Sequence, residues 1–336
     1  MKSIVFPFLF FCLLGMRALD SKTLCLIPFE GCSAEEMFFF PEIHKGENLN
    51  RFYLFRELLE EAGYSLKFSL DQPLEDDLAA VISFNRCHWS FMAQLMLYPK
   101  SKRWLFCFEP PVVMPQLYHS RLQEEFDKIF VMFDEWVDNR TWHKFYYPQP
   151  KLQQSEPTPD FSKKMLCCMI NNNKYYCHPD ELYSERRNII SFFSFLKKEE
   201  FDLYGGGWQG YCPWKGTIPN KVEVLKNYRF CICYENMKNQ RGYITEKIFD
   251  CLISGCVPVY LGADNITDYI PQECFIDRRK FSSHEELYRF LKQINKERYQ
   301  VYLNAAKSFL ESPQAALFSV EAFTKMILNH LEEKQS

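Results

Sequence analysis

The stretch that decides the fold covers residues 228–262 and reads YRFCICYENMKNQRGYITEKIFDCLISGCVPVYLG. An apolar run over 230–234 predicts a buried strand, and a polar loop follows it. Thr245 is placed to cap a helix, and apolar residues then recur at helical spacing until Gly255 ends the helix. The apolar run over 257–261 predicts the next buried strand.

This order of strand, loop, helix and strand is typical of half of a doubly wound nucleotide-binding sheet. Ligands bind such sheets at the carboxyl ends of the strands, which is where the polar loop is predicted to lie. The polar side chains in and after this loop are Glu235, Asn236, Tyr243, Glu246 and Lys247. We therefore expect this region to hold a nucleotide.

Composition indicates a globular protein with a large core. The chain has 336 residues, enough for two domains, and 47% of them are hydrophobic. The formal net charge of -3 argues against a nucleic-acid-binding protein, because no strong positive field would attract a phosphate backbone. Fourteen cysteines occur without a C-x-x-C pair, so we expect those in apolar runs, such as Cys231 and Cys233, to be buried free thiols.

The first twenty residues, MKSIVFPFLFFCLLGMRALD, resemble a secretory signal peptide. A lysine precedes an apolar run over 4–14, which is too short to span a bilayer well. A short membrane anchor is the first alternative, and a buried first strand is the second. Secretion or membrane association through the N-terminus is therefore predicted.

The remaining chain alternates between strand and helix patterns, which favours parallel sheets covered on both faces. Strands are predicted at 23–30, 65–70, 79–84, 103–108, 129–133, 165–170 and 201–204, and helices at 51–63, 91–98, 182–198 and over much of 283–330. A proline-rich segment, with four prolines within 148–160, predicts a linker over 151–161. We expect an N-terminal Rossmann-like domain over 21–150 and a C-terminal one over 162–336 with a helical tail. Two such α/β domains would face each other across a cleft.

Several segments carry a family likeness. YRFCICYEN, GYITEKIFD and GCVPVYLG closely resemble the donor-binding signature of the α-1,3/1,4-fucosyltransferases, glycosyltransferase family 10. ERRNII and FDLYGGG fit the same pattern upstream, and SKRWLFCFEPP resembles the segment that carries the catalytic carboxylate. The likeness is close over roughly 160–300 and weaker over 75–135.

The resemblance implies an enzyme of the GT-B type, with GDP-fucose on the C-terminal domain and the acceptor sugar on the N-terminal domain. The implied reaction is an inverting transfer of L-fucose from GDP-β-L-fucose to a hydroxyl of an oligosaccharide or glycoconjugate, in α-1,3 or α-1,4 linkage. The implied location is the secretory pathway or cell envelope: the Golgi in a eukaryote, or the periplasm or membrane in a bacterium. No metal or other cofactor is obligatory for this fold type.

The resemblance assigns the general base to Glu109. This residue follows the predicted strand 103–108, and Pro110 and Pro111 after it offer no backbone N–H donors. A carboxylate with few donors has a raised pKa, which suits a base; the alternative is a solvated glutamate at a strand end. Pro110 stands where the family pattern has a serine.

The resemblance also assigns donor-binding roles. Lys247 would place a positive charge beside the diphosphate near a helix N-terminus. Glu246 would contact the donor or merely favour the helix start, and Tyr243 would contact the donor or be a core aromatic residue. The full donor-binding set is Asn236, Tyr243, Glu246, Lys247, Arg187 (with Arg186 as an equal alternative) and Lys215, which is displaced from the family's basic position.

Two other functions remain open. One is a GT-B transferase that uses another nucleotide sugar. The other is a catalytically silent sugar-binding protein, an alternative that rests on Pro110 standing where the family pattern has a serine. A Rossmann dehydrogenase lacks support, because no G-x-G-x-x-G follows a predicted strand. The acceptor is expected to contact loops within 30–50 and 85–125, whose aromatic residues include Phe38, Phe39, Phe40 and Trp89.

Overall fold

The computed structural model describes residues 22–40, 50–71, 77–155, 159–196, 200–211 and 213–333. The predicted signal peptide or anchor over 1–20 lies outside these residues. Within them, none of the helices combines the length and the apolar character that a membrane crossing requires.

The N-terminal unit is built on a parallel sheet whose described strands follow the order β2-β1-β3-β4-β5-β6. Its strands are β1 (Thr23–Ile27), β2 (Ser65–Lys67), β3 (Leu78–Phe84), β4 (Arg103–Cys107), β5 (Lys128–Val131) and β6 (Trp142–Lys144). Its helices are α1 (Asn50–Glu61), α2 (Trp89–Leu95) and α3 (Ser120–Gln123). Every residue of β1 and β4 is buried, as expected for strands covered on both faces.

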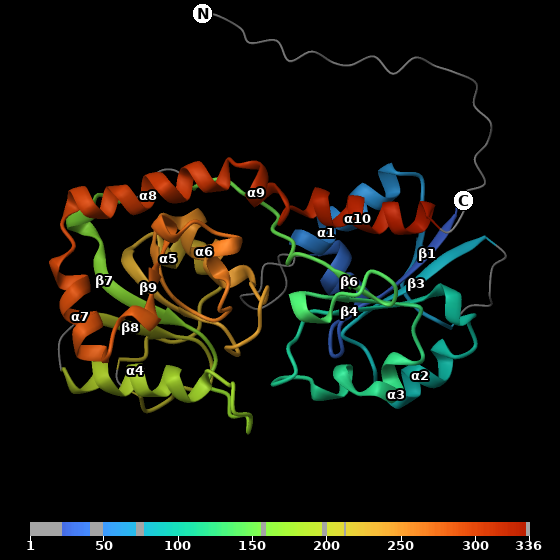
Figure 1. The fold of residues 1–336 in the computed structure, drawn as a ribbon, viewed down its shortest axis with the longest axis horizontal. Helices are drawn as coiled ribbons and strands as arrows, with labels where there is room; N and C mark the ends of the chain where they lie inside the picture. Colours follow the sequence, from blue (N-terminus) through green and yellow to red (C-terminus); the bar gives the residue numbers. More distant parts are fainter. Residues whose placement is uncertain are drawn as a thin grey trace, which may run out of the picture.

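The C-terminal unit is built on a second parallel sheet, in the order β11-β10-β9-β7-β8. Its strands are β7 (Met165–Ile170), β8 (Phe201–Tyr204), β9 (Tyr228–Tyr234), β10 (Val257–Leu261) and β11 (Ile276–Asp277). Its helices are α4 (Tyr183–Phe195), α5 (Lys221–Leu225), α6 (Glu246–Ser254), α7 (His284–Gln293), α8 (Lys296–Leu310) and α9 (Pro313–Ala316). In Figure 1, α5, α6 and α8 cover one face of this sheet and α4 covers the other.

The predicted elements are present, with differences at their ends and at the sheet edges. The strands predicted at 165–170, 201–204 and 257–261 have those bounds, and Gly255 ends α6 in the left-handed conformation, with a φ of 64°. The strand predicted over 65–70 ends at Lys67. β6 and β11 were not predicted, because each is an edge strand too short to show an alternating pattern.

The end of the chain corrects one expectation. We expected the whole of 162–336 to form the C-terminal domain, but α10 (Val320–Glu332) returns to the N-terminal sheet and lies beside α1 (Figure 1). The ring of Phe323 lies 5.2 Å from that of Phe55 and 5.3 Å from that of Phe106. The apolar face of α10 is buried there, so the chain crosses between the two units twice.

The two units meet at the carboxyl ends of their strands. Figure 1 shows the strands of both sheets running toward the junction between the units. Side chains contact each other across it: the ring of Phe133, which follows β5, lies 5.6 Å from the ring of Tyr243, which follows β9. The junction is therefore the place where residues after β4, β5 and β9 come together.

The cysteines within the described residues are free thiols. Those predicted in apolar runs, such as Cys167, Cys168, Cys231 and Cys233, are buried. Burial raises the pKa of Cys168 well above its ordinary value, so this thiol stays protonated at neutral pH. These cysteines act as small apolar core residues, as predicted.

Candidate active site

Glu235, the first residue after β9, is at the centre of the polar cluster. Its side chain is fully buried, and it accepts hydrogen bonds from the backbone N–H of Thr245 (2.9 Å) and from the Thr245 hydroxyl (2.8 and 3.0 Å). Lys247 Nζ lies 3.1 Å from Glu235 Oε2. A Cβ on Gly262 would lie 2.6 Å from Glu235 Cγ, so the glycine leaves room for this carboxylate.

These contacts change the role predicted for Thr245. Thr245 is the residue before the first turn of α6, but its side chain makes no capping hydrogen bond. Its hydroxyl instead donates to Glu235 and accepts from Lys247 Nζ at 3.0 Å. Thr245 therefore joins the buried glutamate to the lysine, and its side chain does not cap the first backbone N–H groups of α6.

Lys247 and Glu246 form the first turn of α6. Lys247 Nζ lies 3.7 Å from Glu246 Oε1, and the lysine side chain is 23% exposed. Burial alone would lower the pKa of Lys247, but the carboxylates of Glu235 and Glu246 raise it above its ordinary value. Burial opposes ionisation of Glu246, yet Lys247, Lys221 and Arg51 hold its pKa well below the usual range. Both groups are charged at neutral pH, beside the positive end of a helix dipole.

The structure separates the two candidate arginines. Arg186 is buried and donates from one nitrogen to the carbonyl oxygens of Tyr234 and Glu235, each at 2.7 Å, and to Asn236 Oδ1 at 3.0 Å. Arg187 instead donates to the carbonyl oxygen of Lys174 and lies 4.1 Å from the ring centre of Tyr175. Arg186 is thus the arginine that joins the polar cluster, and Arg187 is not brought into it.

A periodicity in the sequence could have distinguished them. The buried residues of α4 include Tyr183, Arg186, Ile190 and Phe193, which recur at helical spacing. Arg186 falls on this apolar stripe and Arg187 falls one residue beside it. A buried arginine on a helix stripe needs acceptors nearby, and the carbonyl groups at the end of β9 supply them.

Asn236 and Tyr243 lie at the two ends of the loop that follows β9. Asn236 accepts from Arg186, and its carbonyl oxygen accepts from the backbone N–H of Leu182. Tyr243 is 1% exposed and packs with the core of the N-terminal unit against Phe133. Burial raises its pKa well above the ordinary value, so its hydroxyl is neutral.

Glu109 lies just after β4, on the N-terminal side of the junction. Its backbone is fixed by two side chains that the sequence did not single out. Asn85 Oδ1 accepts from the backbone N–H groups of Phe108 (2.6 Å) and Glu109 (3.3 Å), and the Tyr118 hydroxyl donates to the Glu109 carbonyl oxygen at 2.7 Å. Asn85 itself has a φ of 52°, a conformation that asparagine tolerates better than most residues.

The charge of Glu109 reaches the C-terminal unit. Burial is the main cause that raises the pKa of Tyr183 to about 12, and the Glu109 carboxylate adds to it. The same carboxylate contributes to the raised pKa of Tyr243, after burial and Glu235. The carboxylate therefore acts electrostatically on tyrosines at the start of α4 and in the loop before α6.

Lys215 lies elsewhere on the C-terminal unit. Its Nζ is 3.3 Å from Asp202 Oδ1 on β8, and its side chain is 52% exposed. The glycines before it pack against the backbone that follows β7: a Cβ on Gly205, which has a φ of 120°, would overlap the carbonyl oxygen of Asn171. The triple-glycine segment thus serves close packing, and Lys215 does not reach the polar cluster.

Two further expectations concern metals and aromatic residues. Within the part of the chain that the structure describes, no three His, Cys, Asp or Glu side chains are arranged to hold a metal ion. Phe38 is a core residue, whereas Phe39, Phe40 and Trp89 are 37%, 54% and 77% exposed. The exposed aromatic residues are available for contacts with a ligand, and Phe38 is not.

The fold is shared with glycosyltransferases of known structure. A crystal structure of an α1,3-fucosyltransferase with GDP aligns with 96% of this chain and 94% of its own, at 15% identity and a TM-score of 0.56. An α-glucosyltransferase in complex with UDP and DNA aligns with 93% of this chain and 100% of its own, at 11% identity and a TM-score of 0.58. These similarities confirm the predicted α/β fold of the GT-B type.

Two curated relatives match part of the chain. A mouse 4-galactosyl-N-acetylglucosaminide 3-α-L-fucosyltransferase 9 is 30% identical over 153 residues, which are 44% of this chain and 39% of the mouse protein. An Arabidopsis thaliana α-(1,4)-fucosyltransferase is 39% identical over 71 residues, which are 21% of this chain and 18% of the plant protein. The matched part of the chain thus spans less than half the length of these curated relatives.

The family profile agrees with the motifs. Residues 160–325 match the profile described as "Glycosyltransferase family 10 (fucosyltransferase) C-term". This range contains β7 to β11 and the polar cluster around Glu235. Residues 160–325 are therefore similar to the C-terminal domain of glycosyltransferase family 10.

Proposed function

We propose that this protein is an inverting fucosyltransferase that moves L-fucose from GDP-β-L-fucose to a hydroxyl of an acceptor glycan, with Glu109 as the general base. The donor diphosphate would lie at the start of α6, beside Lys247. The acceptor would approach from the N-terminal unit, in α-1,3 or α-1,4 linkage. GDP-fucose is then a co-substrate, and no metal is required.

One observation carries the proposal. A lysine paired with the buried carboxylate of Glu235 stands at a helix N-terminus on one side of the junction, and Glu109 follows β4 on the other, with its backbone held by Asn85 and Tyr118. An inverting transfer needs these two groups: a cation for the leaving diphosphate and a base for the acceptor hydroxyl. The match of residues 160–325 to the fucosyltransferase family profile supports GDP-fucose as the donor.

The proposed reaction is a single displacement at the anomeric carbon of fucose. The acceptor oxygen forms a bond to that carbon while the bond to the β-phosphate oxygen breaks, and the hydroxyl proton passes to Glu109. The negative charge that develops on GDP is stabilised by Lys247 and by the first backbone N–H groups of α6. Arg186 holds the end of β9 in place, which keeps Glu235 and Lys247 in register.

The test compares the wild-type protein with Glu109→Gln, using radiolabelled GDP-fucose and a panel of acceptor glycans. We expect transfer in the wild type and a loss of at least 100-fold in Glu109→Gln, with GDP affinity unchanged, because removal of a general base costs about 10²–10⁴-fold. Glu124→Gln, an exposed glutamate on the same unit, is the matched control and should keep full activity. Equal activity of Glu109→Gln and wild type would contradict the role of Glu109.

The same assay decides between the alternatives. GDP-mannose and UDP-sugars are offered in parallel, and a clear preference for a UDP-sugar would overturn the choice of donor. GDP-fucose binding without transfer in any variant, including Pro110→Ser, would identify a sugar-binding protein instead. The serine variant is informative because Pro110 replaces a hydroxyl that the family pattern has beside the base.

The cellular setting is part of the proposal. We infer that the protein works in a secretory compartment or cell envelope, the Golgi in a eukaryote, since its acceptors would be glycans and its N-terminus resembles a signal peptide or anchor. Fractionation of expressing cells, followed by protease protection of the intact membranes, tests this location. Complete digestion without detergent would contradict a luminal location.

A further inference from the structure

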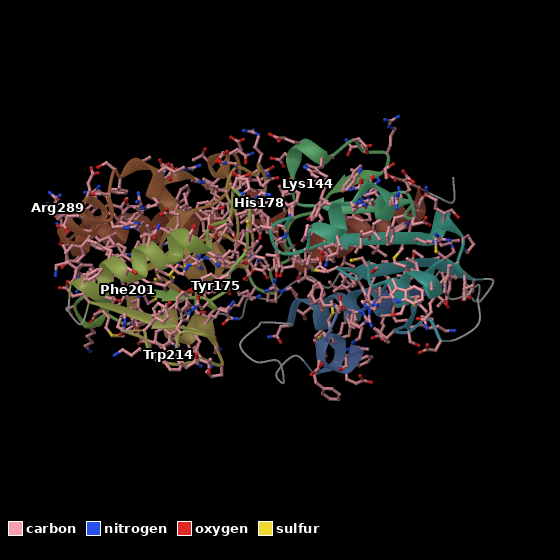
Figure 2. All side chains as sticks on the ribbon, turned by 90° about the horizontal axis from the view of Figure 1, so that it is seen from below. Lys144, Tyr175, His178, Phe201, Trp214 and Arg289 are labelled. Atoms are coloured by element: carbon pink, nitrogen blue, oxygen red, sulfur yellow. The ribbon has the colours of Figure 1, made fainter. Side chains whose placement is uncertain are left out.

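Asp134, on the N-terminal unit, is a centre of hydrogen bonds at the junction. It follows β5, and its carboxylate accepts from Lys144 Nζ (2.6 Å), Asn265 Nδ2 (2.9 Å) and the Tyr269 hydroxyl (2.5 Å). Lys144 belongs to the same unit and lies beside the C-terminal unit in Figure 2. Asn265 and Tyr269 come from the C-terminal unit, after β10, so the carboxylate joins the two units.

The same group of residues holds the loop that leads into α6. The backbone N–H of Asp134 donates to the carbonyl oxygen of Arg241 at 3.0 Å. The Oδ1 atom of Asn265 accepts from the backbone N–H of Gly242 at 2.8 Å. Asp134 is thus bonded directly to residue 241. It is linked to residue 242 through Asn265, whose side chain it orients.

The packing around Gly242 leaves no room for a side chain at this position. Gly242 has a φ of 77°, and a Cβ there would overlap Asp134 Oδ1, Lys144 Nζ and the carbonyl oxygen of Met132. Lys144 Nζ also donates to that Met132 carbonyl oxygen. The loop therefore fits closely against the Asp134–Lys144 pair, and its position depends on the geometry of that pair.

Charge supports the contact. Burial alone would raise the pKa of Asp134, but Lys144, Tyr269 and Asn265 lower it below the usual range. The side chain of its partner Lys144 is 17% exposed, and that of Asp134 is 25% exposed. The carboxylate is thus ionised at neutral pH and accepts hydrogen bonds from these three side chains.

The geometry points to Asp134 as a positioning residue for the donor site. Acting through Asn265, it fixes residues 241–243 before any ligand arrives, which places Tyr243 and the start of α6. This inference rests on the proposed function, because it assumes that the donor binds at Lys247. A loop ordered in advance saves the entropy that binding would otherwise have to supply.

The test begins with the protein free of nucleotide. Hydrogen exchange of the Gly242 amide is compared in the wild type, Asp134→Ala, Asn265→Ala and Asp264→Ala. Asp264 is the control, because it is an aspartate like Asp134 and precedes Asn265 in the chain, but its carboxylate pairs with Arg279. We expect the Gly242 amide to exchange at least about tenfold faster in Asp134→Ala and in Asn265→Ala, since the loop then opens more easily, and to be unchanged in Asp264→Ala.

The Asp134 variant is decisive, because the Gly242 amide bonds to Asn265 and not to Asp134. Wild-type protection of this amide in Asp134→Ala would overturn the inference. Amides of β4 and β7 are followed in the same samples and must stay protected, which shows that the chain remains folded. Asp134→Asn keeps a carbonyl oxygen as an acceptor and should give an intermediate exchange rate.

The second measurement is GDP affinity by titration calorimetry. We expect Asp134→Ala to weaken GDP binding about tenfold while the Asp264→Ala control binds as the wild type does. Faster loop exchange with unchanged GDP affinity would overturn the positioning role. A wild-type protein that binds no GDP would instead overturn the proposed function, and the exchange measurement would still decide whether Asp134 orders the loop.

Discussion

Replacement of Lys247 by methionine tests the donor site most informatively. The substitution keeps the length and apolar stem of the side chain and removes the charge that lies 3.1 Å from Glu235 and at the start of α6. A hydrogen-bonded contact to a charged group contributes about 1.5–3 kcal/mol. GDP affinity should therefore fall by roughly 10- to 150-fold.

The same substitution also affects stability. Glu235 is fully buried, and without Lys247 its carboxylate keeps, among the residues that the structure describes, the hydrogen bonds from Thr245. Breaking a buried ion pair on one side costs about 3–5 kcal/mol. Because Lys247 keeps 23% of its exposure, we expect a loss of about 2–3 kcal/mol in the free energy of unfolding at neutral pH.

The assay is titration calorimetry with GDP and with guanosine, at a temperature where urea titration shows each variant folded. Lys215→Met is the matched control, since Lys215 is an exposed lysine of the same unit that pairs with Asp202. We expect Lys247→Met to weaken GDP binding, with guanosine binding kept, and Lys215→Met to leave both unchanged. GDP affinity within twofold of wild type in Lys247→Met, or a larger loss in Lys215→Met, would refute the placement of the diphosphate.

Two other substitutions test the energetics of the fold. Burial raises the pKa of Asp250 to about 6, above an unfolded value of roughly 4, so the folded state holds an extra proton between these values and stability falls as pH rises through them. Asp250→Asn should remove this pH dependence and stabilise the protein by about 1–2 kcal/mol at pH 7, with little gain below pH 4. Urea titrations at both pH values check this, and an equal difference between wild type and variant at the two pH values would contradict it. Phe323→Ala should cost about 3–5 kcal/mol, because its ring packs between Phe55 and Phe106; a loss below 1 kcal/mol in the same titration would mean that α10 does not anchor the chain to the N-terminal unit.

The central strands of the C-terminal sheet were predicted better than the edge strands and the position of α10. Apolar runs give the bounds of β7 and β10, because strands buried on both faces leave an uninterrupted pattern. β8 was predicted from a shorter pattern in which buried and half-buried residues alternate. The edge strands β6 and β11 have three and two residues, too few to establish a period. The docking of α10 on the N-terminal sheet could not be predicted, since an apolar stripe shows that a helix packs but not on which sheet.

The candidate site was predicted in its residue types and less well in its geometry. Asn236, Tyr243, Glu246 and Lys247 lie around the end of β9 and the start of α6, where the loop pattern placed them. The central position of Glu235 was missed, because a buried carboxylate is recognised only from its partners Thr245 and Lys247. Local spacing cannot reveal contacts between segments, such as those that Asn85 and Tyr118 make around Glu109.

A crystal structure of the chain with GDP bound tests the central claim most directly. We predict that an oxygen of the β-phosphate lies within hydrogen-bonding distance of Lys247 Nζ, at the N-terminus of α6, with the Glu109 carboxylate facing the same space from the N-terminal unit. A diphosphate bound away from α6, or a Glu109 side chain directed away from the nucleotide, would contradict the account.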